Sequence, residues 1–383
     1  MSLGPIEIEV IRNALTAAAA EMDITIWRTS RSTTVRELLD YSTAVFDAEG
    51  NNVAQSARIP QHLNSMGAAL RILLDRFVDA ADWREDDVVA TNDPYCGAQH
   101  LNDILVFKPV FHDGKRVAYV GALCHHIDMG GMAPGSYAAT ATEVFQEGLR
   151  IPPLKLIEGG VLNKAIYAMI GQNVRKPALM LGDLQSQLAS LEVGAASIRR
   201  IAARYGAATL IEATGRILDQ SEAAMRAAIR AMPDGTYAFE DFLDDDGVSG
   251  EPVRLHASIA IKGDEIEVDL TECADQQRGP INCTPAMPIV RFITALSPRL
   301  MAPCLPMRAA IAPFAFVTGK AVSRPAARRH PLRIALLFAI GWPMSCSAAC
   351  IRRCRIGCLQ LIMAVHTLPL SRPKRRMVGA KCW

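Results

Sequence analysis

The stretch that decides the fold is ILVFKPVFHDGKRVAYVGALC, residues Ile104–Cys124. Two runs rich in β-branched and aromatic residues flank Asp113-Gly114, and an Asp-Gly pair between such runs is a strong signal for a β-hairpin. With Asp113-Gly114 as a two-residue loop, the numbers of paired residues sum to 227, so residue 102 faces residue 125. We therefore expect the hairpin to bring HLND, residues 100–103, beside HHID, residues 125–128.

Residue types that can bind metals gather at the open end of this hairpin. The whole chain has only 8 histidines, and several of them lie here with aspartates: His100, Asp103, His125, His126 and Asp128. Imidazole and carboxylate groups together suit Zn²⁺, Mn²⁺ or Fe²⁺, and oxygen ligands favour an open coordination sphere that keeps water for hydrolysis. We predict a divalent metal site made by His100, Asp103 and His125, with Asp128 and Glu37 as additional candidates.

The ideal hairpin raises a geometric objection to this site. In it Asp103 faces Cys124 and points to the opposite side of the sheet from His125, because side chains alternate along a strand. A metal site therefore requires a bulge in the strand or an irregular HLND segment, and Pro94 and Gly97 favour irregular backbone nearby. The alternative is that these polar side chains end the strands and bond to turns.

Three further features permit a functional or a structural interpretation. Arg150, in QEGLRIPP, can bind a substrate carboxylate through two hydrogen bonds, or it can pair with Glu143 or Glu147. Cys124 is expected to be a small buried residue, since it lies within an apolar strand. The acidic run at residues 244–246 lacks the ligand spacing of a calcium-binding loop, so we expect a solvated turn.

The rest of the chain alternates between helical and strand patterns. Apolar periodicity predicts helices near 6–28, 62–78, 181–205 and 208–232, and hairpins near 41–56 and 253–271. Since the strands follow one another in hairpins, the fold class is predicted to be α+β with antiparallel hairpins. The sequence has no GxxxxGK[ST] loop, and MGGMAPG lacks the strand–helix context of a dinucleotide site.

Charge divides the chain into two regions. After Asp275 there is no Asp or Glu, so residues 1–286 carry 25 basic and 39 acidic residues, and the remaining 16 basic residues follow without any acid. The formal net charge is thus −14 (25 − 39) before Met287 and +16 from it onward. We predict a folded region over 1–287 and an aberrant, poorly ordered basic tail over 288–383, such as a shifted reading frame produces.

Other interpretations of the tail stay open, namely an arm for nucleic acid or an anionic membrane, and a membrane helix. The run IALLFAIGWPM, residues 334–344, is about half of the ~20 residues that span a bilayer, and it contains a proline. At the other end, MSLGPIEIEV has acidic residues where a signal peptide has basic ones. We therefore expect a cytoplasmic protein that binds neither nucleic acid nor membrane.

Six motifs, in this order, resemble the hydantoinase B/oxoprolinase family. They are IPQHLNSM (59–66), TNDPYCGAQHLNDI (91–104), HHIDMGG (125–131), VFQEGLRIPPLKL (144–156), NVRKPALMLGDLQSQ (173–187) and PDGTYAFEDFLDDDG (233–247). The resemblance extends to about Met287, and the later part of the family is not recognisable. Where many relatives have a histidine, this chain has Cys96, which is expected to alter the metal preference.

The resemblance implies ATP-dependent hydrolysis of a small cyclic amide. A partner A-type ATPase subunit phosphorylates the substrate, and the B-type subunit acts on the activated species at a metal site, which holds manganese in the carboxylases of this group. Carried onto this chain, the metal ligands are His100, Asp103, His125 and Glu37, with Asp128 and Arg150 as catalytic residues. Two alternatives are a ketone carboxylase subunit and a remnant that the altered C-terminus has inactivated.

Overall fold

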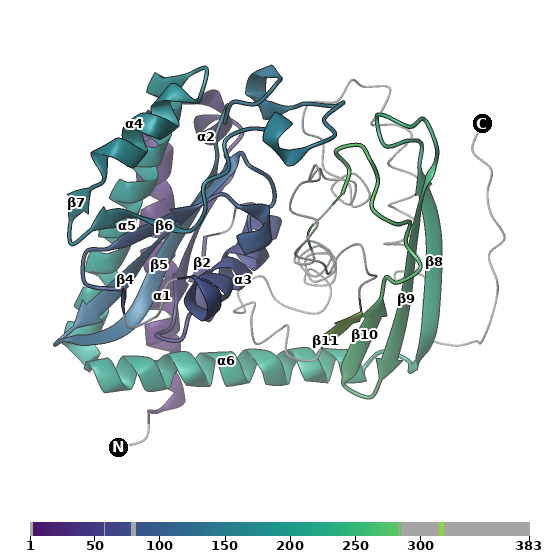
Figure 1. The fold of residues 1–383 in the computed structure, drawn as a ribbon. Helices are drawn as coiled ribbons and strands as arrows, with labels where there is room; N and C mark the ends of the chain where they lie inside the picture. Colours follow the sequence, from purple (N-terminus) through teal and green to yellow (C-terminus); the bar gives the residue numbers. More distant parts are fainter. Residues whose placement is uncertain (1–2, 57, 78–81, 283, 285–313, 318–383) are drawn as a thin grey trace.

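The computed structural model describes residues 3–56, 58–77, 82–282, 284 and 314–317, and it contains two β-sheets, the first of them covered by helices (Figure 1). The fold is α+β with antiparallel hairpins, as the sequence predicts. The tail predicted over 288–383 lies outside the described residues, except for a strand at 314–317. Within the described part, no helix is both long enough and apolar enough to cross a membrane.

The first sheet has seven strands in the order β2-β1-β5-β4-β3-β6-β7. Its strands are β1 Tyr41–Phe46, β2 Asn52–Gln55, β3 Val88–Thr91, β4 Asp103–His112, β5 Lys115–His125, β6 Leu154–Glu158 and β7 Val161–Leu162. The predicted hairpin of β4 and β5 forms its centre, and Asp113 and Gly114 both have the positive φ that a tight two-residue turn requires. Strand β1 pairs with the other edge of β5, so a segment far away in the sequence lies beside the hairpin.

Helices cover both faces of this sheet. They are α1 Pro5–Thr29, α2 Thr33–Arg36, α3 Pro60–Arg76, α4 Lys164–Gln172, α5 Pro177–Tyr205 and α6 Ala207–Arg230. On one face, α1 and α5 share a core with the sheet that includes Met22, Val120 and Leu191. On the other face, Met66 and Leu70 of α3 pack into a second core with the sheet. Because both faces are buried, the central strands are apolar at nearly every position rather than at alternate ones.

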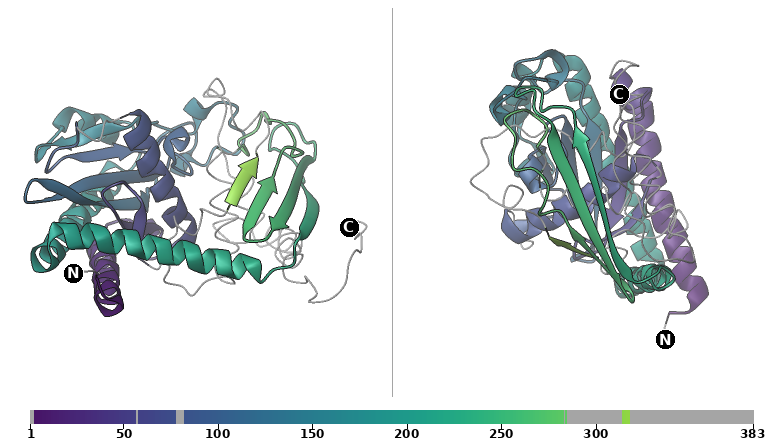
Figure 2. Two further views of the ribbon diagram at one scale, coloured as in Figure 1. Left: turned by 90° about the horizontal axis from the view of Figure 1, so that it is seen from below. Right: turned by 90° about the vertical axis from the view of Figure 1, so that its right-hand side faces the viewer.

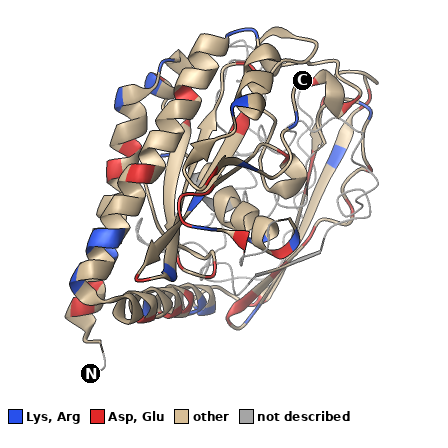
Figure 3. Ribbon diagram, turned by 60° about the vertical axis from the view of Figure 1, so that its left-hand side comes forward, with Lys and Arg blue, Asp and Glu red and all other residues tan. Residues whose placement is uncertain are grey.

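The second sheet lies at the far end of the long helix α6 (Figure 2). Its order is β11-β10-β9-β8, with β8 Gly235–Leu243, β9 Val253–Lys262, β10 Glu265–Asp269 and β11 Phe314–Val317. Met225 and Ile229 of α6 pack against Ile261, Ile266 and Val268 of this sheet. Basic and acidic residues both occur along α1 and α6 (Figure 3), which is typical of solvated helix surfaces.

The acidic run after β8 is not the uniformly solvated turn that the sequence predicts. Asp244 and Asp245 are exposed, but Asp246 is fully buried. Its Oδ1 accepts a hydrogen bond from the backbone N–H of Ser249, and its Oδ2 accepts one from the backbone N–H of Gly279. Asp246 therefore fastens the connection between β8 and β9 to the segment that follows β10.

A β-bulge in β5 changes the register of the central hairpin. Near the turn the numbers of paired residues sum to 227, as predicted, but from the pair Val110 and Ala118 onward they sum to 228. Val117 is the extra residue on β5. The predicted pairing of residues 102 and 125 is therefore wrong by one position, and Asp103 pairs with His125. Both side chains consequently point to the face of the sheet that α3 covers.

Candidate metal centre

The centre lies at the open end of the β4–β5 hairpin. Asp103 is the first residue of β4, His125 is the last residue of β5, and His100 lies in the turn before β4. The Nδ1 atoms of His125 and His100 are 3.4 Å and 3.5 Å from Oδ1 of Asp103. One ligand atom from each residue lies within 4.8 Å of the other two. The structure thus brings together three of the residues that the sequence predicts as metal ligands.

The burial of Asp103 fits the binding of a cation. Its side chain is fully buried, and neither carboxylate oxygen accepts a hydrogen bond of standard geometry from any residue that the structure describes. A buried carboxylate without hydrogen bonds is costly unless an opposite charge compensates it. Two imidazoles and one such carboxylate form a ligand set that Zn²⁺ and Mn²⁺ accept, so the residues present fit a divalent metal.

The surrounding imidazoles keep Asp103 ionised. Burial raises the pKa of the Asp103 carboxyl, but the neighbouring imidazoles of His100, His125 and His62 outweigh burial and lower this pKa to about 2. The rings of His100 and His125 meet edge to face, with their centres 4.6 Å apart, so both reach the same carboxylate. Asp103 is therefore in the form that binds metals at neutral pH.

Two buried residues, Asp40 and His62, extend the cluster and were missed by the sequence analysis. The backbone N–H of His125 donates to the carbonyl of Asp40, which continues the pairing of β1 with β5. One carboxylate oxygen of Asp40 is 3.8 Å from Nδ1 of His125, and the other is 3.4 Å from Nε2 of His62. Both residues reach the site because β1 and α3 pack there from distant parts of the chain, and no local sequence pattern predicts such packing. The place of His62 within IPQHLNSM was the one available signal.

Glu37, predicted as a further ligand, does not join this cluster. It ends the short helix α2 and is exposed, and among the described residues it forms no ion pair with the histidines. Leu39, with a φ of 56°, turns the chain immediately afterwards. The buried carboxylate on this side of the centre consequently belongs to Asp40 and not to Glu37.

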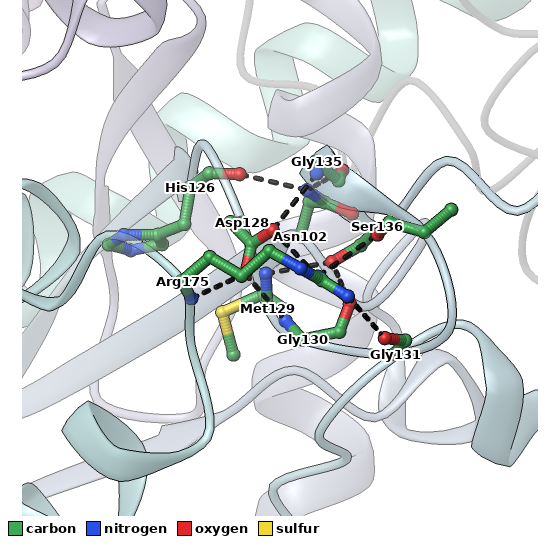
Figure 4. A network of polar contacts seen from close by, with 10 residues as sticks. Asn102, His126, Asp128, Met129, Gly130, Gly131, Gly135, Ser136 and Arg175 are labelled. Carbon is green, nitrogen blue, oxygen red and sulfur yellow. Dashed lines mark hydrogen bonds and ion pairs between the residues drawn. The ribbon is translucent and has the colours of Figure 1, made fainter.

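Asp128 organises the glycine-rich loop that follows β5 (Figure 4). Its Oδ1 accepts hydrogen bonds from the backbone N–H groups of Gly130 and Arg175, and its Oδ2 accepts from the backbone N–H of Gly135 and the guanidinium of Arg175. Burial raises the pKa of Asp128, but these hydrogen bonds outweigh burial and lower it. Both oxygens are engaged, so the predicted catalytic role requires Asp128 to break these bonds.

The same loop leads to Tyr137 beside the centre. The Tyr137 hydroxyl is 3.2 Å from Nε2 of His125, and the residue remains 45% exposed. The guanidinium of Arg175 also donates to three carbonyl groups of the loop, at residues 130, 131 and 133. Arg175 and Asp128 therefore fix the backbone that carries Tyr137. Neither Arg175 nor Tyr137 was singled out from the sequence.

Asn92, fully buried, joins two further loops of this region. Its side chain donates to the carbonyls of Leu101 and Leu149 and accepts from the backbone N–H of Ile151. It thereby couples the turn that carries His100 to the segment that carries Arg150. The predicted catalytic Arg150 has its Nε 3.8 Å from a carboxylate oxygen of Asp93, and 27% of its side chain is exposed.

His126, Cys124 and Cys96 lie outside the three-residue group. His126 is fully buried, with Nε2 2.9 Å from Oε1 of Gln187 on α5, on the opposite side of the sheet from His125. Cys124 is buried in the core beneath α1 and α5, as predicted, and burial raises the pKa of its thiol well above the usual value. Cys96 is buried in the short 3-10 helix Pro94–Cys96.

Known proteins share this fold and sequence pattern. A family model described as hydantoinase B/oxoprolinase matches residues 4–319, which extends past Met287, where the recognisable motifs end. The chain is 35% identical to an uncharacterised protein of Methanocaldococcus jannaschii, covering 79% of this chain and 53% of that protein. It is 34% identical to the beta subunit of caprolactamase from Pseudomonas jessenii, covering 70% of this chain and 46% of that subunit. The chain thus spans about half the length of the curated relatives it matches.

Solved structures of known proteins also share the fold. The crystal structure of ATP-dependent caprolactamase from Pseudomonas jessenii superposes with a TM-score of 0.81 at 30% identity, covering 88% of this chain and 58% of that one. A nucleotide-free structure of acetone carboxylase superposes with a TM-score of 0.75 at 20% identity, covering 81% of this chain and 43% of that one. At that lower identity, the second likeness concerns the fold alone.

Proposed function

Because the chain belongs to the hydantoinase B/oxoprolinase family, we propose that it acts as the B-type subunit of an ATP-dependent hydrolase that opens small cyclic amides. The likeness to a caprolactamase subunit supports a cyclic amide as the substrate class. The observation that carries the proposal is the fully buried Asp103 carboxylate, which lies between two imidazoles and accepts no hydrogen bond of standard geometry within the described part of the chain.

In this proposal His100, Asp103 and His125 hold a divalent metal, Mn²⁺ or Zn²⁺. When bound, such an ion supplies Lewis-acid polarisation of a carbonyl group and lowers the pKa of water. The ionised state of Asp103 and its burial supply a negatively charged ligand. Tyr137, whose hydroxyl lies against Nε2 of His125, orients that ring from the exposed side.

The remaining residues of the proposal bind the substrate or hold a loop in position. Arg150 binds a carboxylate of the substrate, because a guanidinium forms two parallel hydrogen bonds to that group. Asp128 acts with Arg175 and holds the loop that carries Tyr137. An amide ring is a poor electrophile, and phosphorylation of its oxygen creates a better leaving group. We assign that step to a partner A-type ATPase subunit, which uses ATP for this chain in the cytoplasm.

A ketone carboxylase subunit is the alternative activity within the family. The caprolactamase beta subunit, whose name gives a cyclic amide as substrate, is 34% identical to this chain, whereas the acetone carboxylase structure is 20% identical. These similarities favour the amide. A second alternative is an inactive remnant, in which an altered C-terminal region has removed turnover from a chain that keeps the fold.

The experiment combines metal analysis with turnover. The full chain is incubated with Mn²⁺ or Zn²⁺, desalted and measured by plasma mass spectrometry, and ring opening of hydantoin, 5-oxoproline and caprolactam is followed with ATP and an added A-type subunit. We expect about one metal per chain, and product that depends on both ATP and metal. A folded chain that retains no metal and opens no ring contradicts the proposal and supports the inactive remnant.

A further inference from the structure

His62 reaches the metal centre from a different layer of the fold. It lies near the start of α3, which covers the sheet face where Asp103 and His125 meet, and the residue is only 4% exposed. Its Nε2 is 3.4 Å from Oδ1 of Asp40, which is 3% exposed. The other oxygen of Asp40 is 3.8 Å from Nδ1 of His125. The Asp40 carboxylate thus lies between two imidazoles, one of which belongs to the proposed ligand set.

The ring of His62 is also held on its other side. Its Nδ1 is 3.4 Å from Oγ of Ser42, which is fully buried on β1. Asp40 and Ser42 point to the same face of the sheet because side chains alternate along a strand. When the Ser42 hydroxyl donates to Nδ1, the proton of the neutral ring is on Nε2, where it can be donated to Asp40. The two contacts therefore select one tautomer and one ring orientation.

We propose that His62 is a positioning residue of the metal centre, which holds the Asp40 carboxylate at Nδ1 of His125, the ring nitrogen that also faces Asp103. This inference rests on the proposed function, because it requires His125 to bind a metal. Residues hydrogen-bonded to the side chains of a metal centre hold those side chains in place, and the loss of such partners lowers metal affinity by roughly 10–100-fold. An ordinary core histidine affects the stability of the fold but leaves metal affinity unchanged.

Three substitutions in the full chain separate these roles. His62→Leu removes both ring nitrogens, whereas His62→Gln keeps an amide N–H close to the position of Nε2. His256→Leu is the matched control, because this imidazole faces Glu272 in the second sheet, with Nδ1 3.8 Å from its carboxylate. Each protein is stripped of metal and titrated with Mn²⁺ by isothermal titration calorimetry, and its melting temperature is measured without metal by circular dichroism.

We expect His62→Leu to weaken Mn²⁺ binding by about 10–100-fold and His62→Gln to recover most of that loss. The control should bind Mn²⁺ like the wild type. A folded His62→Leu protein with wild-type Mn²⁺ affinity overturns the inference and leaves the proposed function intact. Failure of the wild type to bind Mn²⁺ or Zn²⁺ is a different result, which contradicts the proposed function itself.

Ser42→Ala decides the matter if His62→Leu does not fold. This change removes only the hydroxyl that orients Nδ1 and keeps a small buried side chain on β1. We expect a smaller loss of Mn²⁺ affinity, of about 3–10-fold, because His62 is still present but less well oriented. An unchanged affinity in Ser42→Ala, with an unchanged melting temperature, overturns the inference.

Discussion

Asp103 and His125 are directly opposite each other on β4 and β5, with Oδ1 of the carboxylate 3.4 Å from Nδ1 of the imidazole. This contact depends on the bulge at Val117, which shifts the pairing by one residue between the turn and the open end. Without the bulge, Asp103 would lie opposite Cys124, and His125 would point to the other face of the sheet. Bulges commonly redirect a side chain in this way beside functional sites.

The first prediction concerns the substitution Asp103→Asn. The amide has nearly the same shape as the carboxylate but no negative charge, so the fold is kept and the anionic ligand is lost. We expect Mn²⁺ affinity to fall by at least about 100-fold. The loss of a residue that only holds a ligand in place already lowers metal affinity by about 10–100-fold, and Asp103 is itself a proposed ligand. Calorimetric titration of the metal-free protein measures this change.

The matched control is Asp113→Asn at the other end of the same hairpin. The Asp113 side chain is 86% exposed, and its positive φ is well tolerated by asparagine. It should leave Mn²⁺ affinity unchanged. Equal affinities of the Asp103→Asn and Asp113→Asn proteins would show that the carboxylate of Asp103 is not a ligand.

Local signals predicted the hairpin well and the site only in part. The Asp113-Gly114 turn predicts the strands on either side of it, but no local pattern reports the extra residue at Val117 that brings Asp103 to His125. The Asp40 carboxylate was missed for a related reason. Its position depends on the pairing of β1 with β5, a long-range contact that hydrophobic alternation within β1 does not reveal. The carboxylate named as an additional ligand instead was that of Glu37, which is exposed.

The second prediction concerns Gly97, in the turn that precedes His100. Its φ is +102°, and a Cβ atom there would lie 2.6 Å from Cα of Ala69 on α3. Gly114 also has a positive φ, of +72°, but a Cβ atom there would meet no atom of the described residues within 4 Å. We expect Gly97→Ala to lower the free energy of unfolding by more than about 3 kcal/mol, because backbone strain of about 1–3 kcal/mol is joined by a clash with backbone atoms.

Gly114→Ala is the control for this prediction, because it carries the backbone strain without the clash. It should lower the free energy of unfolding by about 1–2 kcal/mol. Urea denaturation followed by circular dichroism measures both proteins. Similar losses in the free energy of unfolding at the two positions would mean that the close approach of α3 to Gly97 does not exclude a side chain there.

The third prediction concerns the pair of Arg175 and Asp128. Arg175→Gln removes the guanidinium that donates to Asp128 and to the loop carbonyls, while the backbone N–H donors to Asp128 remain. Because 39% of the Arg175 side chain is exposed, we expect a loss of about 1–2 kcal/mol in the free energy of unfolding, less than for a fully buried pair. Arg200→Gln, with 69% of its side chain exposed, should cost less than about 0.5 kcal/mol. Equal losses for Arg175→Gln and Arg200→Gln in urea denaturation would show that the Arg175 guanidinium does not stabilise the loop.

The fourth prediction concerns pH and Asp246. Burial raises the pKa of this carboxyl, but hydrogen bonds from Ser249, Val248 and Gly279 outweigh burial and hold its pKa well below the usual range. A lowered pKa in the folded state means that the ionised form stabilises the fold. This contribution is fully present above the unfolded pKa of about 3.9, and it is lost as the pH falls through the lower folded value.

Asp246→Asn should therefore destabilise the protein most at pH 5–7 and progressively less below about pH 4. Urea denaturation at a series of pH values gives the difference between the wild type and the variant. Asp244→Asn, at an exposed position of the same turn, serves as the control and should follow the wild type at every pH. A difference for Asp246→Asn that does not vary with pH would show that its hydrogen bonds do not favour the ionised form.

The last prediction tests where the folded region ends. The sequence predicts a boundary at residue 287, yet the family model continues to residue 319 and β11 pairs in parallel with β10, from Ile266 with Phe314 to Asp269 with Val317. A chain of residues 1–287 lacks β11 and leaves the edge of β10 without that partner, whereas a chain of residues 1–319 keeps it. We expect the shorter chain to unfold at lower urea concentration, with a loss of at least about 1 kcal/mol from the missing ladder hydrogen bonds. Equal stabilities would place the boundary at residue 287 and make β11 dispensable to the fold.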